Sequence, residues 1–265
     1  MDIRKLFFLI FICFSVFVFA NPEDLKTVKK SWTLKQKTDS LCNWSWEIRN
    51  ANVSKSLNYA NEALIYANET KSNALICKAL FYKGSALNNA GQAKQALKLL
   101  YKALDLLSFL NDKLLSARIY NAIGLANVNI SQYDEAIEFY NKAIEVYELI
   151  EDYEGIAMQL QNIGVVYYLI GRSEEALDYY LKSVKILEDI DDASLSILAN
   201  NYTNTAIVYM QIEDLQKALQ FFNKAAKMYS ELNDDSGLAH VFLNMGVMYF
   251  SVDIDSALYF HQNAL

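Results

Sequence analysis

The sequence predicts an all-α fold, an α-solenoid in which about six antiparallel helix pairs form a right-handed superhelix. Three observations predict it. A small residue is followed about twelve positions later by an alanine, this unit recurs about every forty residues, and Pro22 is the only proline. Small residues at fixed places in such a period mark where two helices approach backbone to backbone. The three sets are Gly84, Gly124, Gly164, Ala206 and Gly246; Ala96, Ala136, Ala176, Ala218 and Ala257; and Ala103, Ala143, Ser183, Ala225 and Ala264.

The first element, residues 1–20, is expected to be a signal peptide rather than part of the fold. Arg4 and Lys5 precede an apolar run over residues 6–19, and the run ends on Ala20 with a residue pattern that suits cleavage after it. The run is short for a membrane span, which needs about 20 residues. An uncleaved N-terminal anchor is the alternative. We therefore expect export. The Asn-, Lys-, Ile- and Tyr-rich composition is typical of low-GC bacteria, which would make the destination the periplasm.

The next elements are a polar N-terminal segment over residues 21–37 and a degenerate first repeat over residues 38–74. In that repeat two small residues occupy the second helix, but Trp44 stands where the first helix should have a small residue. We expect this repeat to cap the array, because the end of a stack of repeats has to be covered. Five clearer repeats follow over residues 77–265, the last of them incomplete.

The unit over residues 118–157 shows how one repeat is built. Apolar residues recur at helical spacing before and after a turn at residues 131–135. Asp134 and Glu135 begin the second helix, where carboxylates suit the positive end of the helix dipole. Short acidic connections join the repeats, and their side chains are expected to cap the next first helix: Asn111-Asp112, Glu151-Asp152, Asp191-Asp192 and Asn233-Asp234-Asp235.

These positions resemble the tetratricopeptide repeat family. Its pattern is a large and then a small residue in the first helix, followed by alanine, an aromatic residue and alanine in the second. Three copies match it: Tyr120, Gly124, Ala136, Tyr140 and Ala143; Leu160, Gly164, Ala176, Tyr180 and Ser183; and Tyr202, Ala206, Ala218, Phe222 and Ala225. The unit here is about six residues longer than the common one and lacks its closing proline. It is similar to the long variety found in kinesin light chains and in bacterial regulators that bind peptides or partner domains.

The resemblance implies a concave binding face lined by the first helices. Amide side chains beside aromatic ones could hydrogen-bond the backbone of an extended peptide and stack on its side chains. The alternative interpretation is that these amides are only solvated helix residues. The candidate ligand-binding residues are Arg118, Asn121, Asn129, Gln161, Tyr168, Thr203 and Gln211.

Composition and motifs argue against other classes of function. A net charge of −7 with a pI near 5.0 disfavours nucleic acid as a partner. No motif predicts catalysis, a metal site or a cofactor. His261 is expected to pack in the core, and the acidic cluster near Glu188 to solvate and cap helices. Cys42 and Cys77 are expected to be buried free thiols, although a disulfide between them stays open.

The sequence thus predicts an exported, non-catalytic scaffold or adaptor that binds a protein or peptide. The alternative is the periplasmic sensory ectodomain of a membrane-spanning signalling protein, with a histidine kinase or helix-turn-helix domain beyond this chain. The last helix stops at Leu265, about six residues before its counterparts in other repeats end. We therefore expect the chain to continue past Leu265, where it could carry a membrane tether.

Overall fold

The computed structural model describes residues 28–264 except 108–109, 192 and 251–252, and leaves out the side chain of His261. The expected signal peptide (1–20) and the first seven residues of the polar segment (21–37) lie outside this part of the chain, as does the packing expected for His261. The described residues form twelve α-helices and no strand. In pairs they are α2 (Leu34–Glu47) and α3 (Val53–Thr70), α4 (Asn73–Asn89) and α5 (Ala93–Leu107), α6 (Lys113–Asn129) and α7 (Tyr133–Leu149), α8 (Tyr153–Leu169) and α9 (Ser173–Glu188), α10 (Leu195–Gln211) and α11 (Leu215–Glu231), and α12 (Asp235–Tyr249) and α13 (Ile254–Asn263).

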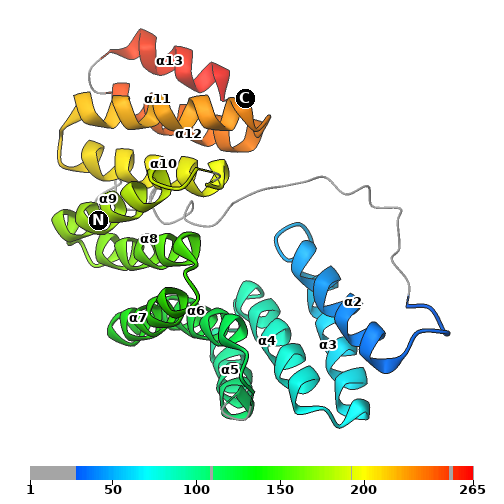
Figure 1. The fold of residues 1–265 in the computed structure, drawn as a ribbon. Helices are drawn as coiled ribbons and strands as arrows, with labels where there is room; N and C mark the ends of the chain where they lie inside the picture. Colours follow the sequence, from blue (N-terminus) through cyan, green and yellow to red (C-terminus); the bar gives the residue numbers. More distant parts are fainter. Residues whose placement is uncertain (1–27, 108–109, 192, 251–252, 265) are drawn as a thin grey trace.

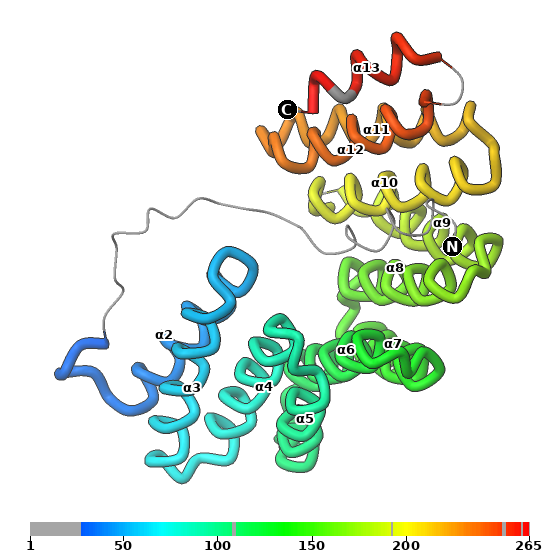
Figure 2. Tube along the Cα trace, turned by 180° about the vertical axis from the view of Figure 1, so that it is seen from behind, coloured from blue at the N-terminus to red at the C-terminus, as the bar shows by residue number. Residues whose placement is uncertain are grey.

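The six pairs stack in chain order and confirm the predicted solenoid. Each first helix packs against its own second helix, and each second helix packs against the next first helix. First helices of neighbouring pairs also touch at α2–α4, α4–α6, α8–α10 and α10–α12, whereas neighbouring second helices show no comparable contact within the described residues. The first helices therefore lie on the inside of the bend that the array makes in Figure 1, and the second helices lie on the outside. Figure 2 shows the same order from behind.

The recurring small residues lie where the two helices of a pair meet, as predicted. A Cβ added at Gly84 would be 2.8 Å from Leu100, and one added at Gly124 or Gly164 would be 2.6 or 2.7 Å from the ring of Tyr140 or Tyr180. Real Cβ atoms do not approach other heavy atoms so closely, so a side chain at these positions would force the helices apart. The small residues thus set the distance between the helices of each pair.

A second close approach, which the repeat pattern did not predict, joins the second helix of one pair to the first helix of the next. A Cβ at Gly155 would be 2.4 Å from the ring of Tyr147, and one at Gly237 would be 2.3 Å from the ring of Tyr229. Both glycines follow their tyrosine by eight residues. Where the preceding second helix has a smaller residue at the tyrosine position, the next first helix has a larger one at the glycine position: Ala67 with Leu75, Leu107 with Leu115, and Leu187 with Ile197. Size is therefore matched across each junction between repeats.

The turns within the helix pairs repeat a backbone conformation. The residue seven positions after the small residue has a positive φ in four pairs, at Gly91 (73°), Ser131 (61°), Gly171 (80°) and Glu213 (65°). This left-handed conformation suits glycine and is strained for other residues. Ser131 and Glu213 adopt it nonetheless, so the stacking of the helices outweighs the local preference.

Three of the four acidic connections act as helix caps, as expected, whereas the expectation was wrong for Asp191-Asp192, because α10 begins after Ser194 and Asp192 lies outside the described residues. A side-chain oxygen of Asp112 accepts a hydrogen bond from the backbone N–H of Leu115 at 2.9 Å, and the same bond recurs three residues apart at Asp152 (2.8 Å) and Asp234 (2.9 Å). At α10 a carboxylate from the preceding pair takes over this role, because the backbone N–H of Ser194 donates to Glu154. In α6, α8, α10 and α12, a carboxylate therefore satisfies one otherwise unpaired backbone donor at the start of the helix.

The first pair departs in two details from the sequence-based description. Helix α2 begins at Leu34, four residues before the expected start of the repeat, because Thr33 and Gln36 form a capping box. The small residue that meets the second helix is Ser45 and not Trp44. The Ser45 and Ser56 hydroxyls lie 3.1 Å apart and the Ser56 hydroxyl donates to the Ser45 carbonyl at 2.8 Å. The two small residues are thus 11 positions apart, one fewer than in the four pairs from α4 to α11, although five residues rather than three separate α2 from α3.

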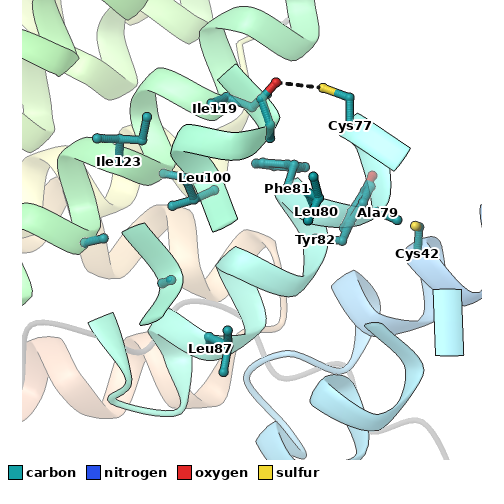
Figure 3. Packing of buried hydrophobic residues seen from close by; sticks show 14 of the residues in the cluster. Cys42, Cys77, Ala79, Leu80, Phe81, Tyr82, Leu87, Leu100, Ile119 and Ile123 are labelled. Carbon is teal, nitrogen blue, oxygen red and sulfur yellow. Dashed lines mark hydrogen bonds between the residues drawn. The ribbon is translucent and has the colours of Figure 1, made fainter. Parts of the chain in front are cut away.

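Both described cysteines are buried free thiols, which confirms the preferred interpretation over a disulfide. The Cys77 thiol donates to the backbone carbonyl of Ala103 at 3.2 Å, the contact marked in Figure 3. In the pair α8–α9 the donor is on the second helix instead: the Ser183 hydroxyl donates to the backbone carbonyl of Ala157 on α8 at 2.7 Å. Burial raises the pKa of Cys42 to about 12 and that of Cys77 to about 11, so both thiols stay protonated and unreactive near neutral pH.

Candidate binding surface

The inner face of the array is formed by side chains that recur on the first helices. We define it as the residues three before and four and five after the small residue of each repeat, where the structure describes them. They are Phe81, Asn88, Asn89, Asn121, Val128, Asn129, Gln161, Tyr168, Leu169, Thr203, Met210, Gln211, Leu243 and Phe250.

Amide side chains join neighbouring first helices across this face. Asn129 donates from Nδ2 to Asn88 Oδ1 at 2.9 Å, between α6 and α4. Asn162 donates to Asn121 Oδ1 at 3.0 Å, between α8 and α6, and Asn201 donates to Gln161 Oε1 at 3.2 Å, between α10 and α8. These three bonds form an amide ladder. Each bond uses only part of the capacity of two amides, since an amide has two donor hydrogens and an oxygen with two lone pairs.

The predicted site residues differ in how far they reach solvent. Arg118, Asn129 and Gln211 are exposed, and Asn121, Gln161 and Tyr168 are partly buried. Thr203 is 2% exposed and donates its hydroxyl to the carbonyl of Ala199 at 2.9 Å, so it supports α10 from within. Burial raises the pKa of Tyr168 to about 12, which keeps its hydroxyl a neutral donor. A ligand-binding role for these residues stays a prediction.

Sequence reasoning missed the amides that complete the ladder, namely Asn88, Asn162 and Asn201 as bonding partners. The available signal was their spacing, because each bond joins residues 40 or 41 positions apart, one repeat length. Asn201 is fully buried, and its Oδ1 has no protein partner in the described part of the chain. Gln159, at the same repeat position in α8, is also fully buried with its Oε1 unpartnered there. Such atoms destabilise a fold by about 1–3 kcal/mol unless water satisfies them.

Charge is scarce on the helices that form the C-terminal half of this face. Helices α8, α10 and α12 carry only two acidic side chains, Glu154 and Asp235, each in a first turn, and no lysine or arginine. His240 on α12 has its pKa lowered by burial, which favours the neutral form. In the N-terminal half, Lys78 is paired with Asp39 on α2 at 2.7 Å, and Arg118 is exposed. The face therefore offers amides and apolar groups rather than a charged clamp.

Within the acidic cluster, the Glu188 side chain interacts with other helices of the array. The carboxylate of Glu188 accepts a hydrogen bond from the hydroxyl of Tyr202 and forms an ion pair with Lys224 at 3.2 Å. Across the described residues, no three His, Cys, Asp or Glu side chains are grouped in a way that could hold a metal ion. Within the same residues, no helix combines the length and hydrophobicity that crossing a bilayer requires.

Comparison with protein-family models identifies the type of repeat. Tetratricopeptide repeat family models match residues 75–149 and 130–189, and a further one matches residues 199–232. The chain belongs to the tetratricopeptide repeat family. The matched segments coincide with helices α4–α9 and most of α10–α11, and they leave the first and last pairs unmatched. No curated protein matches the chain in sequence.

Solved tetratricopeptide-like structures superpose on most of the chain at low sequence identity. BtubC (BKLC) from P. vanneervenii is 20% identical with a TM-score of 0.64, over 88% of this chain and 90% of that one. A Rap protein complexed with Competence and Sporulation Factor is 16% identical with a TM-score of 0.75, over 86% of this chain and 64% of that one. A STAND signal-transduction ATPase with a tetratricopeptide repeat sensor, from Pyrococcus horikoshii, is 18% identical with a TM-score of 0.70; this chain spans 35% of it. These likenesses show a shared fold.

Proposed function

We propose that this tetratricopeptide protein is an exported, non-catalytic scaffold or adaptor that binds a protein or peptide segment on its inner face. The observation that carries the proposal is the amide ladder on a face with little charge. Amides can bond the backbone of an extended chain whatever its side chains are, because every residue other than proline has one N–H and one C=O. Tyr168 and Met210 supply apolar surface beside them.

One comparison supports binding as the role of this fold. The Rap protein was solved in complex with Competence and Sporulation Factor, so a tetratricopeptide array of similar shape holds a specific partner. The tetratricopeptide repeat that the family models identify in this chain is a fold used for protein binding. A binding surface is therefore the best-supported use of the inner face.

The second candidate function is the sensory part of a signalling protein, in which ligand binding controls a histidine kinase or DNA-binding domain. The STAND ATPase favours it, because a tetratricopeptide array serves there as the sensor of a longer protein. The native protein distinguishes the two. A mass well above 30.2 kDa, with a membrane span and an effector domain, would support the sensor. A native mass at or below that value would support the free scaffold.

Export is a separate part of the proposal and has its own test. N-terminal sequencing of the protein isolated from its native cells is expected to begin at Asn21, which follows the predicted cleavage site. Protein that keeps Met1 and fractionates with the cytoplasm would contradict export and leave the binding proposal standing.

Binding on the inner face can be tested by site-specific photo-crosslinking in native cells. A photoreactive amino acid replaces Gln211 or Leu243, which are exposed on the inner face and outside the amide ladder, or Glu145, which is exposed on outer helix α7. We expect the first two positions to capture one common partner and Glu145 to capture none of it. Capture of the same partner from Glu145 alone would move the binding site to the outer surface.

A further inference from the structure

Helix α5 presents a row of unpaired lysines on the outer surface, away from the inner face. Lys94, Lys98 and Lys102 follow one another at four-residue spacing, which places them on one side of the helix. All three are exposed, and none forms an ion pair among the described residues. The helix contains one carboxylate, Asp105. This is unusual in a chain with a net charge of −7.

Two other repeats carry an ion pair at these positions. At the positions of Lys98 and Lys102, helix α7 has Glu138 and Lys142, which form an ion pair at 2.6 Å. Helix α9 has Asp178 and Lys182 there, also paired at 2.6 Å. In α5 the acidic member is replaced by Lys98, so that an attractive pair spaced by four residues becomes a repulsive one.

Like charges at this spacing destabilise a helix by a few tenths of a kcal/mol. The array itself therefore gains nothing from Lys98 in stability. A negatively charged group from outside the chain would remove the repulsion, and would interact with lysines that have no competing partner.

Two lysines of the row, Lys98 and Lys102, border an open groove with an apolar floor. The groove lies between α3, α4 and α5 at the N-terminal end of the array, where Figures 1 and 2 both place these helices next to one another, and its volume is about 660 Å³. Its lining combines three lysines, two amides and three leucines: Lys83, Lys98, Lys102, Asn61, Gln95, Leu57, Leu87 and Leu99. Cations around leucines are complementary to a segment that carries both carboxylates and apolar side chains.

From the lysine row and this groove, we propose that α3, α4 and α5 form a second docking site, for an acidic amphipathic segment of a partner protein. Carboxylates of the segment pair with Lys98 and Lys102 while an apolar side chain packs on Leu57 and Leu99. The apolar floor favours a protein segment over a phosphate-rich ligand, because such a ligand has no apolar group to pack against the leucines. The site is distinct from the inner face and lets one array hold two partners at once.

The test uses fluorescence anisotropy with a labelled synthetic peptide of about 18 residues, which has glutamate at every fourth position and leucines beside them. Its control peptide has glutamine in place of each glutamate. Two variants of the full chain are compared. Lys98→Glu recreates the Glu138–Lys142 arrangement of α7 and is expected to leave the fold at least as stable. Lys185→Glu makes the same charge change at an exposed, unpaired lysine on outer helix α9.

We expect wild-type protein to prefer the acidic peptide to its glutamine control, and raising NaCl from about 50 to about 500 mM to weaken that preference. Lys98→Glu should weaken binding roughly tenfold, since it replaces attraction by repulsion in a complementary site, whereas Lys185→Glu should stay within about twofold. Equal losses in the two variants, or no preference for the acidic peptide, would overturn the proposal.

Two further outcomes would also overturn it by assigning the groove another occupant. One is Lys98-dependent binding of vesicles of phosphatidylcholine and phosphatidylglycerol, or of inorganic polyphosphate, that is tighter than binding of the peptide. The other is Lys98-dependent self-association in sedimentation velocity, which would assign the groove to a second copy of this chain. A monomeric wild-type protein that does not bind these phosphate-containing probes is the expected result.

Discussion

Gly155 tests the size matching between repeats most sharply. It lies in the first turn of α8, against the ring of Tyr147 at the end of α7. A Cβ at this position would be 2.4, 2.6 and 2.7 Å from three ring atoms of Tyr147. Tyr147 is only 6% exposed and packs in a cluster with Ala117, Ala143 and Ile156, so the ring has little room to move away.

We expect Gly155→Ala to lower the free energy of unfolding by about 1–2 kcal/mol. Overpacking of a filled core costs about 1–3 kcal/mol, and the better helix propensity of alanine returns up to about 1 kcal/mol. Urea unfolding followed by circular dichroism measures the change. The double variant Tyr147→Leu with Gly155→Leu has the same two residues as Leu107 and Leu115 one repeat earlier. Its loss of unfolding free energy should therefore be smaller than the sum of the losses in the two single variants.

A matched background separates packing from helix propensity. In Tyr147→Leu the ring that an alanine Cβ at position 155 would meet is absent, so Gly155→Ala made in that variant should keep the propensity gain and lose most of the steric cost. If Gly155→Ala were as stable as wild type or more stable, the ring of Tyr147 would not limit this junction. If the double leucine variant showed no coupling, the proposed size matching across the junction would be refuted.

Three further predictions concern turns, a thiol and a buried amide. At the repeated left-handed turn, Gly171→Ala should destabilise the protein by about 1 kcal/mol and Ser131→Gly should stabilise it by a smaller amount; equal stabilities in urea unfolding would contradict the strain argument. The pKa of Cys42 is raised by burial from 9.0 to about 12, so its stabilising effect is complete below pH 9 and is lost as pH rises through the folded-state value. The free energy of unfolding should therefore fall less between pH 8 and pH 10.5 in Cys42→Ala than in wild type, with a difference of up to about 1.4 kcal/mol per pH unit. The same fall in both proteins would argue against burial of the thiol. Gln159→Leu removes a buried oxygen that has no protein partner and should raise stability by about 1 kcal/mol; a loss of similar size would indicate an ordered water or an unrecognised partner.

The repeat architecture could be predicted from sequence because it depends on residue size at fixed intervals. Gly124 and Tyr140 are close in sequence and belong to one helix pair, so their spacing reports directly on one contact. The acidic connections were equally accessible, since a cap acts within three residues of its helix start, as Asp152 does on Gly155.

Contacts between repeats were harder to predict because they join residues that are distant in sequence or differ in identity from one junction to the next. The amide ladder joins Asn121 to Asn162, and only a stack in register brings those residues together. The Tyr147–Gly155 junction changes to two leucines one repeat earlier, so no single residue type marks it. Ser45 was missed for a different reason, since the small residues of the first pair are 11 rather than 12 positions apart, which shifts the first of them by one position relative to Trp44.

The ladder also changes how the inner face should be probed. Asn121 and Gln161 each accept a hydrogen bond from a neighbouring repeat, so alanine at either position would disturb the stack as well as any ligand contact. Arg118 and Gln211 are exposed, and they form no intramolecular hydrogen bond or ion pair in the described structure. They can be changed with little effect on folding.

The central claim is that the inner face binds a protein or peptide segment, and one affinity measurement tests it most directly. The segment captured by photo-crosslinking at Gln211 is synthesised, and isothermal titration gives its Kd for wild type and for the double variant Arg118→Ala with Gln211→Ala. Circular dichroism and urea unfolding confirm that the variant is folded. The account predicts that Kd rises by about tenfold or more, since each lost hydrogen bond contributes about 0.5–1.5 kcal/mol and bonds to a charged group contribute more. An unchanged Kd in the folded variant would contradict it.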